Sequence, residues 1–210
     1  EVFSLPLYIL VALARRRRFL SHEGALKYFL LGAFSSALFL FGAALLYGVT
    51  GSTSFAVVGE GIRTATGLEA MILAGAVLVV SGLAFKLGAV PFHSWTPDAY
   101  QGAPTPVTAF MGAATKAAAT AALIRVSYEA LYTLEWELSW LIWTLAIASM
   151  LLGTVVALVQ TELKRMLAYS SISHAGFILV GVEAAGHTAG TPLGDGVASV
   201  ATYLPLYSVL

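Results

Sequence analysis

The chain has 210 residues, of which 59% are apolar and only 10% are charged, and its mean hydropathy is +0.85. Soluble domains carry roughly a quarter charged residues, so this composition is typical of an integral membrane protein. The 11 basic and 11 acidic residues cancel, which argues against a nucleic acid as partner. The sequence contains no cysteine, which excludes disulfides, thiolate metal sites and thiol nucleophiles in this chain.

Apolar runs separated by charged and turn-forming residues predict five full transmembrane helices and two partial ones. Each full run has about 20 residues, the length that a helix needs to cross a bilayer, and none shows the alternation of a barrel strand. The sequence therefore predicts one all-α, polytopic bundle over residues 1–210, and the apolar runs at both ends predict an internal fragment of a longer chain. The expected spans are residues 1–14, 25–47, 69–90, 105–128, 137–159, 166–186 and 196–210, the first and last incomplete.

Basic residues predict the orientation of these spans. The four arginines at residues 15–18 and the pair Lys164 and Arg165 are separated by an even number of expected crossings, so they lie on the same side. An excess of lysine and arginine marks that side as cytoplasmic. Three tryptophans near the start of the span 137–159 fit the aromatic belt of the outer interface: Trp136, Trp140 and Trp143.

Lys116 is the clearest candidate for a functional residue. It follows Pro106 by ten residues and precedes Arg125 by nine, which places it roughly 15 Å from either end of its helix. A lysine side chain reaches only part of that distance toward water. A charge at this depth costs from about 3 to above 10 kcal/mol, so we expect Lys116 to be retained for function.

Lys86 leaves two interpretations open. In the first, Pro91 ends the helix and the Lys86 side chain extends to the membrane surface. In the second, Gly82, Gly88 and Pro91 break the helix inside the membrane, and the exposed backbone carbonyls line a wet cavity, as in the broken helices of transporters.

Two further groups of polar residues are weaker candidates. Glu1 precedes Arg15 by 14 residues, about 21 Å along a helix, so it lies near the middle of the membrane. A carboxylate at that depth needs a partner, and Lys27 is the nearest basic residue in the next span, although its position near a helix start also suits a surface contact. His93 and His174 lie near the cytoplasmic ends of their helices, where a proton relay and a structural hydrogen bond are both compatible with the sequence.

Buried lysines can move protons. Burial lowers the pKa of a lysine, and a nearby carboxylate raises it again. A lysine whose partner approaches or withdraws therefore takes up or releases a proton, and a line of such groups joined by water forms a proton path.

Two sequence blocks carry a resemblance to a known family. Residues 85–110 are FKLGAVPFHSWTPDAYQGAPTPVTAF, and residues 163–177 are LKRMLAYSSISHAGF. Together with Glu1 and the Ser-Leu-Pro-Leu-Tyr of residues 4–8 that follows it, these blocks closely resemble the antiporter-like membrane subunits of respiratory complex I. Within that family they look like the subunit N group of bacterial NADH–quinone oxidoreductase, the counterpart of mitochondrial subunit 2. The resemblance covers nearly the whole chain.

The resemblance implies roles for the buried charges. It matches Glu1 to the glutamate of the family's fifth transmembrane helix, Lys27 to the lysine of the sixth, Lys86 to the lysine of the broken seventh and Lys116 to the central lysine of the eighth. It also implies that His174 lies near the central water chain as a candidate relay. The family's exit-side lysine lies further along than this sequence extends.

The function implied by the resemblance is proton translocation in the bacterial inner (plasma) membrane, driven by electron transfer in other subunits. The implied partners are the lipid bilayer and the other membrane-arm subunits of complex I, and no nucleic acid is expected. No cofactor is expected in this chain, because FMN, the iron–sulfur clusters and quinone belong to other subunits. The chain counts as an enzyme only as part of this translocase complex.

Three alternative functions are compatible with a membrane bundle of this kind. A subunit of a multi-subunit sodium/proton antiporter shares the Pro-Phe-His-x-Trp-x-Pro-Asp block, and the continuation over residues 100–110 argues against it. A passive structural subunit predicts that neutralising Lys86 and Lys116 leaves pumping intact. A substrate carrier has the least support, because the sequence gives no sign of an internal inverted repeat.

Overall fold

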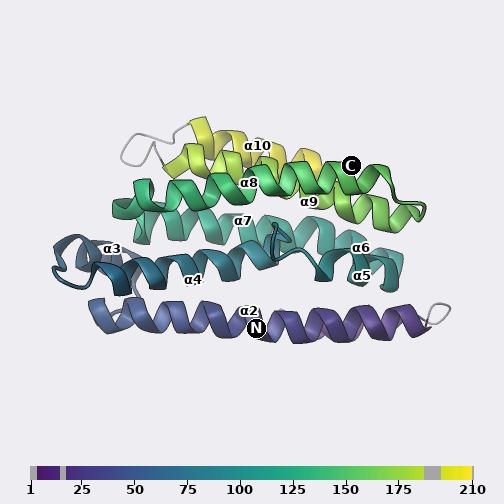
Figure 1. The fold of residues 1–210 in the computed structure, drawn as a ribbon, viewed down its shortest axis with the longest axis horizontal. Coiled ribbons are helices and arrows are strands. Elements are labelled where there is room, and N and C mark those ends of the chain that lie inside the picture. Colours follow the sequence, from purple (N-terminus) through teal and green to yellow (C-terminus); the bar gives the residue numbers. More distant parts are fainter. Residues whose placement is uncertain (1–3, 15–17, 187–194, 210) are drawn as a thin grey trace.

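The computed structural model describes residues 4–14, 18–186 and 195–209 of the chain. Within these ranges nearly every residue is helical, and no β-strand is present. The helices run along one long axis and pack into a bundle (Figure 1). The predicted all-α transmembrane fold is therefore confirmed. The described helices that are long and apolar enough to cross a membrane are Phe19–Thr50, Glu69–Leu87, Thr105–Ala130, Tyr132–Leu158 and Leu163–Ala184.

One long helix dominates the first part of the bundle. The helices here are α1 (Ser4–Val11), α2 (Arg18–Thr50) and α3 (Phe55–Thr64). α2 extends beyond the expected span 25–47 at both ends and runs almost the whole length of the molecule (Figure 1). The sequence analysis did not predict α3, because its 10 residues are too few to cross a membrane. α3 instead buries Val58 and Ile62 and exposes an ion pair between Glu60 and Arg63.

The helix that carries Lys86 is broken inside the bundle. α4 covers Glu69–Leu87 and α5 covers Trp95–Gly102, and Figure 1 shows the two in succession along α2. Gly88 ends α4 with a φ of 74°, a left-handed conformation that suits glycine. Its N–H donates to the Phe85 carbonyl at 3.0 Å, and the Trp95 indole N–H donates to the same carbonyl at 3.1 Å. The end of α4 at Leu87 and the start of α5 at Trp95 confirm the predicted break, whereas the Phe85 carbonyl is hydrogen-bonded rather than free, contrary to the expectation of exposed carbonyls.

A continuous helix follows the break. It consists of α6 (Thr105–Phe110), the π-helical turn η1 (Met111–Thr115), α7 (Lys116–Arg125) and a second π-helical turn, η2 (Val126–Ala130). Pro106 lies in the first turn, where the missing backbone N–H of proline needs no acceptor. π-helical turns often occur at functional positions in helices. The turn η1 ends directly before Lys116, so the helix departs from α geometry beside this lysine.

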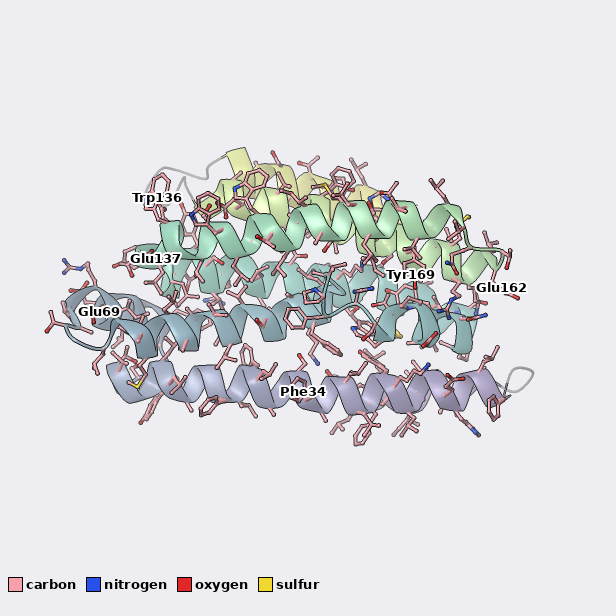
Figure 2. The ribbon with its side chains drawn as sticks, viewed as in Figure 1. Phe34, Glu69, Trp136, Glu137, Glu162 and Tyr169 are labelled. Atoms are coloured by element: carbon pink, nitrogen blue, oxygen red, sulfur yellow. The ribbon has the colours of Figure 1, made fainter. Side chains whose placement is uncertain are left out.

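The last part of the described chain adds three long helices and a short turn. These are η3 (Tyr132–Leu134), α8 (Glu135–Leu158), α9 (Leu163–Gly186) and α10 (Asp195–Val209). The start of α2 and the α8–α9 connection lie at the same end of the bundle (Figure 1), as the even number of crossings predicts. Glu162 lies at this end, and Glu69, Trp136 and Glu137 lie at the opposite end (Figure 2).

Glycines allow α8 and α9 to pack at very short distance. A Cβ atom added at Gly153 would lie 2.5 Å from the backbone nitrogen of Ser173, and one added at Gly176 would lie 2.7 Å from the carbonyl oxygen of Ala146. Real Cβ atoms essentially never approach backbone atoms this closely. Small residues at such contacts are the usual means by which membrane helices associate.

We expect Gly153→Leu to force α8 and α9 apart, because overpacking a tight contact costs typically about 1–3 kcal/mol. The measurement is the thermal unfolding midpoint of the full-length subunit in detergent, which should fall. Gly48→Leu on α2 is the matched control, since a Cβ there would meet nothing closer than the Met71 Cε at 4.0 Å. Equal midpoints for the two variants would contradict the packing argument.

Candidate functional site

Lys116 is buried at the centre of the candidate site. Its side chain is only 2% exposed, and it is among the largest fully buried side chains of the described residues. The Nζ atom donates a hydrogen bond to the backbone carbonyl of Ser171 on α9. Ser171 is itself 4% exposed. The ammonium group predicted from residue counting to lie deep in the membrane therefore has a neutral carbonyl as its hydrogen-bond acceptor.

An aromatic cluster lies beside Lys116 on the α10 side. The Tyr207 ring lies over the Lys116 Nζ, with 5.7 Å between the nitrogen and the ring centroid. The His174 ring lies 5.0 Å from the Tyr207 ring, and the Tyr203 ring lies parallel to the Tyr207 ring at 6.5 Å. The Nδ1 of His174 and the hydroxyl of Tyr203 form a hydrogen bond of 2.5 Å. The structure thus brings His174 close to Lys116, with Tyr207 in contact with both.

A cavity of about 460 Å³ adjoins Lys116. Helices α5, α6, α9 and α10 and the turn η1 all contribute to its walls. Its lining includes the polar side chains Tyr100, Thr108, Lys164, Ser171, His174 and Tyr207. Ser171 and Tyr207 are shared between the cavity and the surroundings of Lys116. A cavity of this size with several polar groups in its wall is suited to hold water.

Lys86 lies in the last turn of α4, next to the helix break. Its Nζ atom donates a hydrogen bond of 2.5 Å to the Ser4 hydroxyl on α1. A second cavity, of about 210 Å³, lies between α2 and α4 and is lined by Lys86, Ser35 and Ser36 among others. Glu1 lies outside the described residues, so its predicted pairing with a lysine stays a prediction. The contact with Ser4 nevertheless places Lys86 against the helix that follows Glu1 in sequence.

Lys27 has partners that the sequence analysis did not identify. Its Nζ atom lies 2.6 Å from a carboxylate oxygen of Glu23 and 2.7 Å from one of Asp98. The other carboxylate oxygen of Asp98 lies 2.5 Å from Arg165 on α9, and Arg165 also donates to the side-chain oxygen of Gln101 at 3.0 Å. Asp98 thereby ties α5 to both α2 and α9.

The pKa of Asp98 responds to this arrangement. Partial burial raises the pKa of the Asp98 carboxyl, but the hydrogen bonds from Lys27 and Arg165 outweigh burial and hold its pKa below the usual value. Asp98 is therefore ionised at neutral pH and forms ion pairs with two cations. We refer to Asp98, Lys27 and Arg165 as the α5 clamp.

The backbone of α5 also approaches α2 closely. A Cβ atom added at Gly24 would lie 2.6 Å from the carbonyl oxygen of Asp98, and one at Gly102 would collide with the carbonyl oxygen of Leu20. Lys164 donates to the Ala103 carbonyl at 2.7 Å from the α9 side. α5, the shorter of the two helices on either side of the break, is thus fixed between α2 and α9.

Residues 1–208 match the family model described as the transmembrane part of the NADH:quinone oxidoreductase/Mrp antiporter family. The chain belongs to this family. A relative from Beutenbergia cavernae, described as NADH-quinone oxidoreductase subunit N, is 54% identical over 209 residues, which cover 100% of this chain and 38% of the relative. The chain therefore spans well under half the length of the curated relatives that it matches.

Solved structures of the NADH:quinone oxidoreductase/Mrp antiporter family share the fold. A chain of respiratory complex I from Thermus thermophilus with bound aureothin is 42% identical, with a TM-score of 0.78 over 100% of this chain and 42% of that chain. A chain of the Mrp complex from Dietzia sp. DQ12-45-1b is 26% identical, with a TM-score of 0.83 over 100% of this chain and 38% of that chain. The fold is common to both complexes, whereas the sequence is more similar to the complex I chain.

The described residues contain no group of three or more histidine, aspartate or glutamate side chains that could hold a metal ion. They do contain one buried carboxylate that the sequence analysis missed. Glu183, near the end of α9, is 6% exposed and accepts a hydrogen bond of 2.5 Å from the Ser139 hydroxyl on α8. Its position near an expected helix end gave no signal of burial. It lies 12 residues along α9 from Ser171, about 18 Å away along the helix axis, so it is separate from the Lys116 site.

Proposed function

We propose that this chain is the proton-translocating part of an antiporter-like subunit N in the membrane arm of a bacterial NADH–quinone oxidoreductase. The observation that carries the proposal is the buried Lys116 ammonium, which adjoins a cavity with several polar side chains in its wall and donates its hydrogen bond to the Ser171 carbonyl rather than to a carboxylate. A buried lysine of this kind gains and loses a proton readily. The 54% identity to a relative described as subunit N supports the choice of complex.

In this proposal protons pass along the buried charges through water. Lys86 at the helix break passes a proton to Lys116, and Glu1 controls the charge on Lys86. His174 is a relay beside Lys116. Lys27 contributes positive charge at the end of the bundle where α5 is clamped, and the exit-side group belongs to a part of the protein that this sequence does not include.

The proposed driving force comes from outside this chain. Electron transfer from NADH to quinone takes place in other subunits, which hold FMN, the iron–sulfur clusters and quinone, and this chain carries no cofactor of its own. Its partners are the neighbouring membrane-arm subunits and the lipids of the bacterial plasma membrane, with no nucleic acid. The exposed apolar side chains along α2 and α8, such as Phe34 and Trp140, fit contact with lipid or neighbouring helices.

The second candidate is a subunit of an Mrp-type sodium/proton antiporter, which the 0.83 TM-score to the Mrp chain favours. The two functions differ in their ion dependence. Proton uptake that requires sodium and continues without NADH would support the antiporter. Proton pumping that requires NADH and is indifferent to sodium would support the complex I subunit.

The test is proton pumping and NADH–quinone turnover in membrane vesicles that carry the complete complex with Lys86→Ala. We expect assembly to be retained and pumping to be lost together with slowed turnover, because the chain of proton-carrying groups is interrupted. Arg63→Ala is the matched control, since it removes an exposed charge on α3 whose ion-pair partner is its neighbour Glu60. Full pumping by an assembled Lys86→Ala complex would overturn the proposal in favour of a passive structural subunit.

A further inference from the structure

The cavity beside Lys116 is separated from the lysine by a thin wall. Lys116 is 2% exposed, although the cavity next to it measures about 460 Å³. Two residues border both the cavity and the ammonium group. Ser171 lines the cavity and accepts the Lys116 hydrogen bond through its carbonyl, and Tyr207 lines the cavity with its ring over the Lys116 Nζ.

Of these two residues, Tyr207 contacts the ammonium through its side chain, which can change rotamer. Ser171 is fixed by the backbone of α9. Tyr207 follows Pro205 by two residues in α10, and a proline inside a helix cannot donate the backbone hydrogen bond that would continue the helix. The Tyr207 side chain is held by ring contacts with His174 and Tyr203 and by the interaction of its hydroxyl with the Ser171 side chain. Such ring contacts can be broken without unfolding the helix.

The contact between Tyr207 and Lys116 depends on the charge of the lysine. A protonated ammonium is attracted to the face of an aromatic ring, whereas a neutral amine lacks this attraction. The other titratable groups of this region in the described chain are His174 on α9, which interacts with Lys116, Tyr203 on α10, which contacts His174, and Tyr100 and Lys164, which line the cavity. The ring that lies over the ammonium itself is that of Tyr207.

We propose that Tyr207 is a gating residue that separates Lys116 from the cavity while Lys116 is protonated and opens when Lys116 has lost its proton. This inference rests on the proposed function. A charged Lys116 holds the ring over itself and closes the water path behind it, so its proton cannot return to the cavity. After the proton has moved on, the ring is released, water from the cavity hydrates the neutral amine, and Lys116 takes up the next proton passed on from Lys86. The gate thus gives the path a direction.

The test measures passive proton leak through the complete complex in phospholipid vesicles, after a pH jump and without NADH. We expect Tyr207→Ala to raise the leak several-fold and to lower the number of protons pumped per NADH, while turnover continues. Tyr207→Phe keeps the ring face and should behave like the unaltered protein. Leu206→Ala, at an exposed neighbouring position on α10, is the matched control and should not leak.

A double variant identifies the route of the leak. Combining Tyr207→Ala with Lys116→Ala should abolish the leak, because the path that Tyr207 closes leads to Lys116. A proton leak that persists in the double variant would overturn the proposed gate. A Tyr207→Ala complex that leaks no more protons than the unaltered complex would overturn it as well. Either result leaves the proposed function standing as long as Lys86→Ala still abolishes pumping.

Two more variants keep the proposal testable if Tyr207→Ala fails to assemble. Tyr207→Leu retains most of the side-chain volume without an aromatic face and should also leak. Pro205→Ala restores the backbone donor and stiffens α10, so it should slow turnover without a leak. Unchanged turnover in Pro205→Ala would contradict the role given to the proline. A Tyr207→Leu complex without an increased proton leak would overturn the proposed gate.

Discussion

Replacing Lys116 with methionine is expected to abolish proton pumping while the complex still assembles. Methionine is close to lysine in length and is apolar, so it can occupy the same buried volume without the need to solvate a charge. The thermal unfolding midpoint of the complex should be unchanged or higher. A structural role for the Lys116 hydrogen bond to Ser171 predicts the opposite result, a lower midpoint with pumping retained.

Lys116→Arg separates charge from proton transfer. A guanidinium keeps its proton at every pH that the complex experiences, so this variant preserves a positive charge but cannot cycle between charged and neutral forms. We expect it to be as defective in pumping as Lys116→Met. Ala118→Met serves as the control for the added side chain, because Ala118 is on the same helix but exposed. Pumping at the normal rate by Lys116→Arg would show that charge alone is required.

The depth of Lys116 could be predicted from sequence because it depends on local geometry. The rise of a helix is fixed, so counting residues from Pro106 and Arg125 locates the lysine within its span. The break beside Lys86 was likewise one of two local outcomes for Gly88 and Pro91. Both features could be predicted without knowing how segments distant in sequence pack against one another.

The contacts of the site could not be predicted because they join residues far apart in sequence. Lys27 and Asp98 are separated by 71 positions, and the sequence offered Lys27 a nearer partner in Glu1. Tyr207 is an aromatic residue on an apolar helix, a pattern that fits lipid or core contact equally well. Its position over Lys116 depends on how α10 packs against η1 and α9. Glu183 was missed for the same reason, since its burial depends on contact with α8.

Removing the carboxylate of Asp98 is expected to release the α5 clamp. In Asp98→Ala, Lys27 and Arg165 lose their shared acceptor, and Lys27 keeps only the exposed Glu23 while Arg165 keeps the neutral Gln101 side chain. Exposed ion pairs contribute about 0–1 kcal/mol and breaking a fully buried pair costs about 3–5 kcal/mol. The Asp98 side chain is 21% exposed and the Lys27 side chain 43% exposed, so the expected loss lies between these two values. We expect a clearly lower unfolding midpoint and loss of pumping, since α5 forms part of the wall of the cavity beside Lys116.

Two variants separate the clamp from a general loss of surface charge. Asp98→Glu keeps the charge and should recover part of the stability. Glu23→Ala removes the other, exposed partner of Lys27 and should have little effect, because exposed ion pairs contribute about 0–1 kcal/mol. If the unfolding midpoint of Glu23→Ala fell as far as that of Asp98→Ala, the contact of Lys27 with Asp98 would contribute no more stability than its contact with Glu23.

The clamp also predicts how stability depends on pH. The folded protein holds the pKa of Asp98 below its usual value, so the stabilisation is complete above the usual carboxyl pKa and is lost as pH falls through the lowered one. The difference in unfolding midpoint between the unaltered protein and Asp98→Asn should therefore be constant near neutrality and shrink in strong acid. A difference that instead grew as pH fell would mean that Asp98 is protonated more readily in the folded protein, and would exclude it as the acceptor for Lys27 and Arg165.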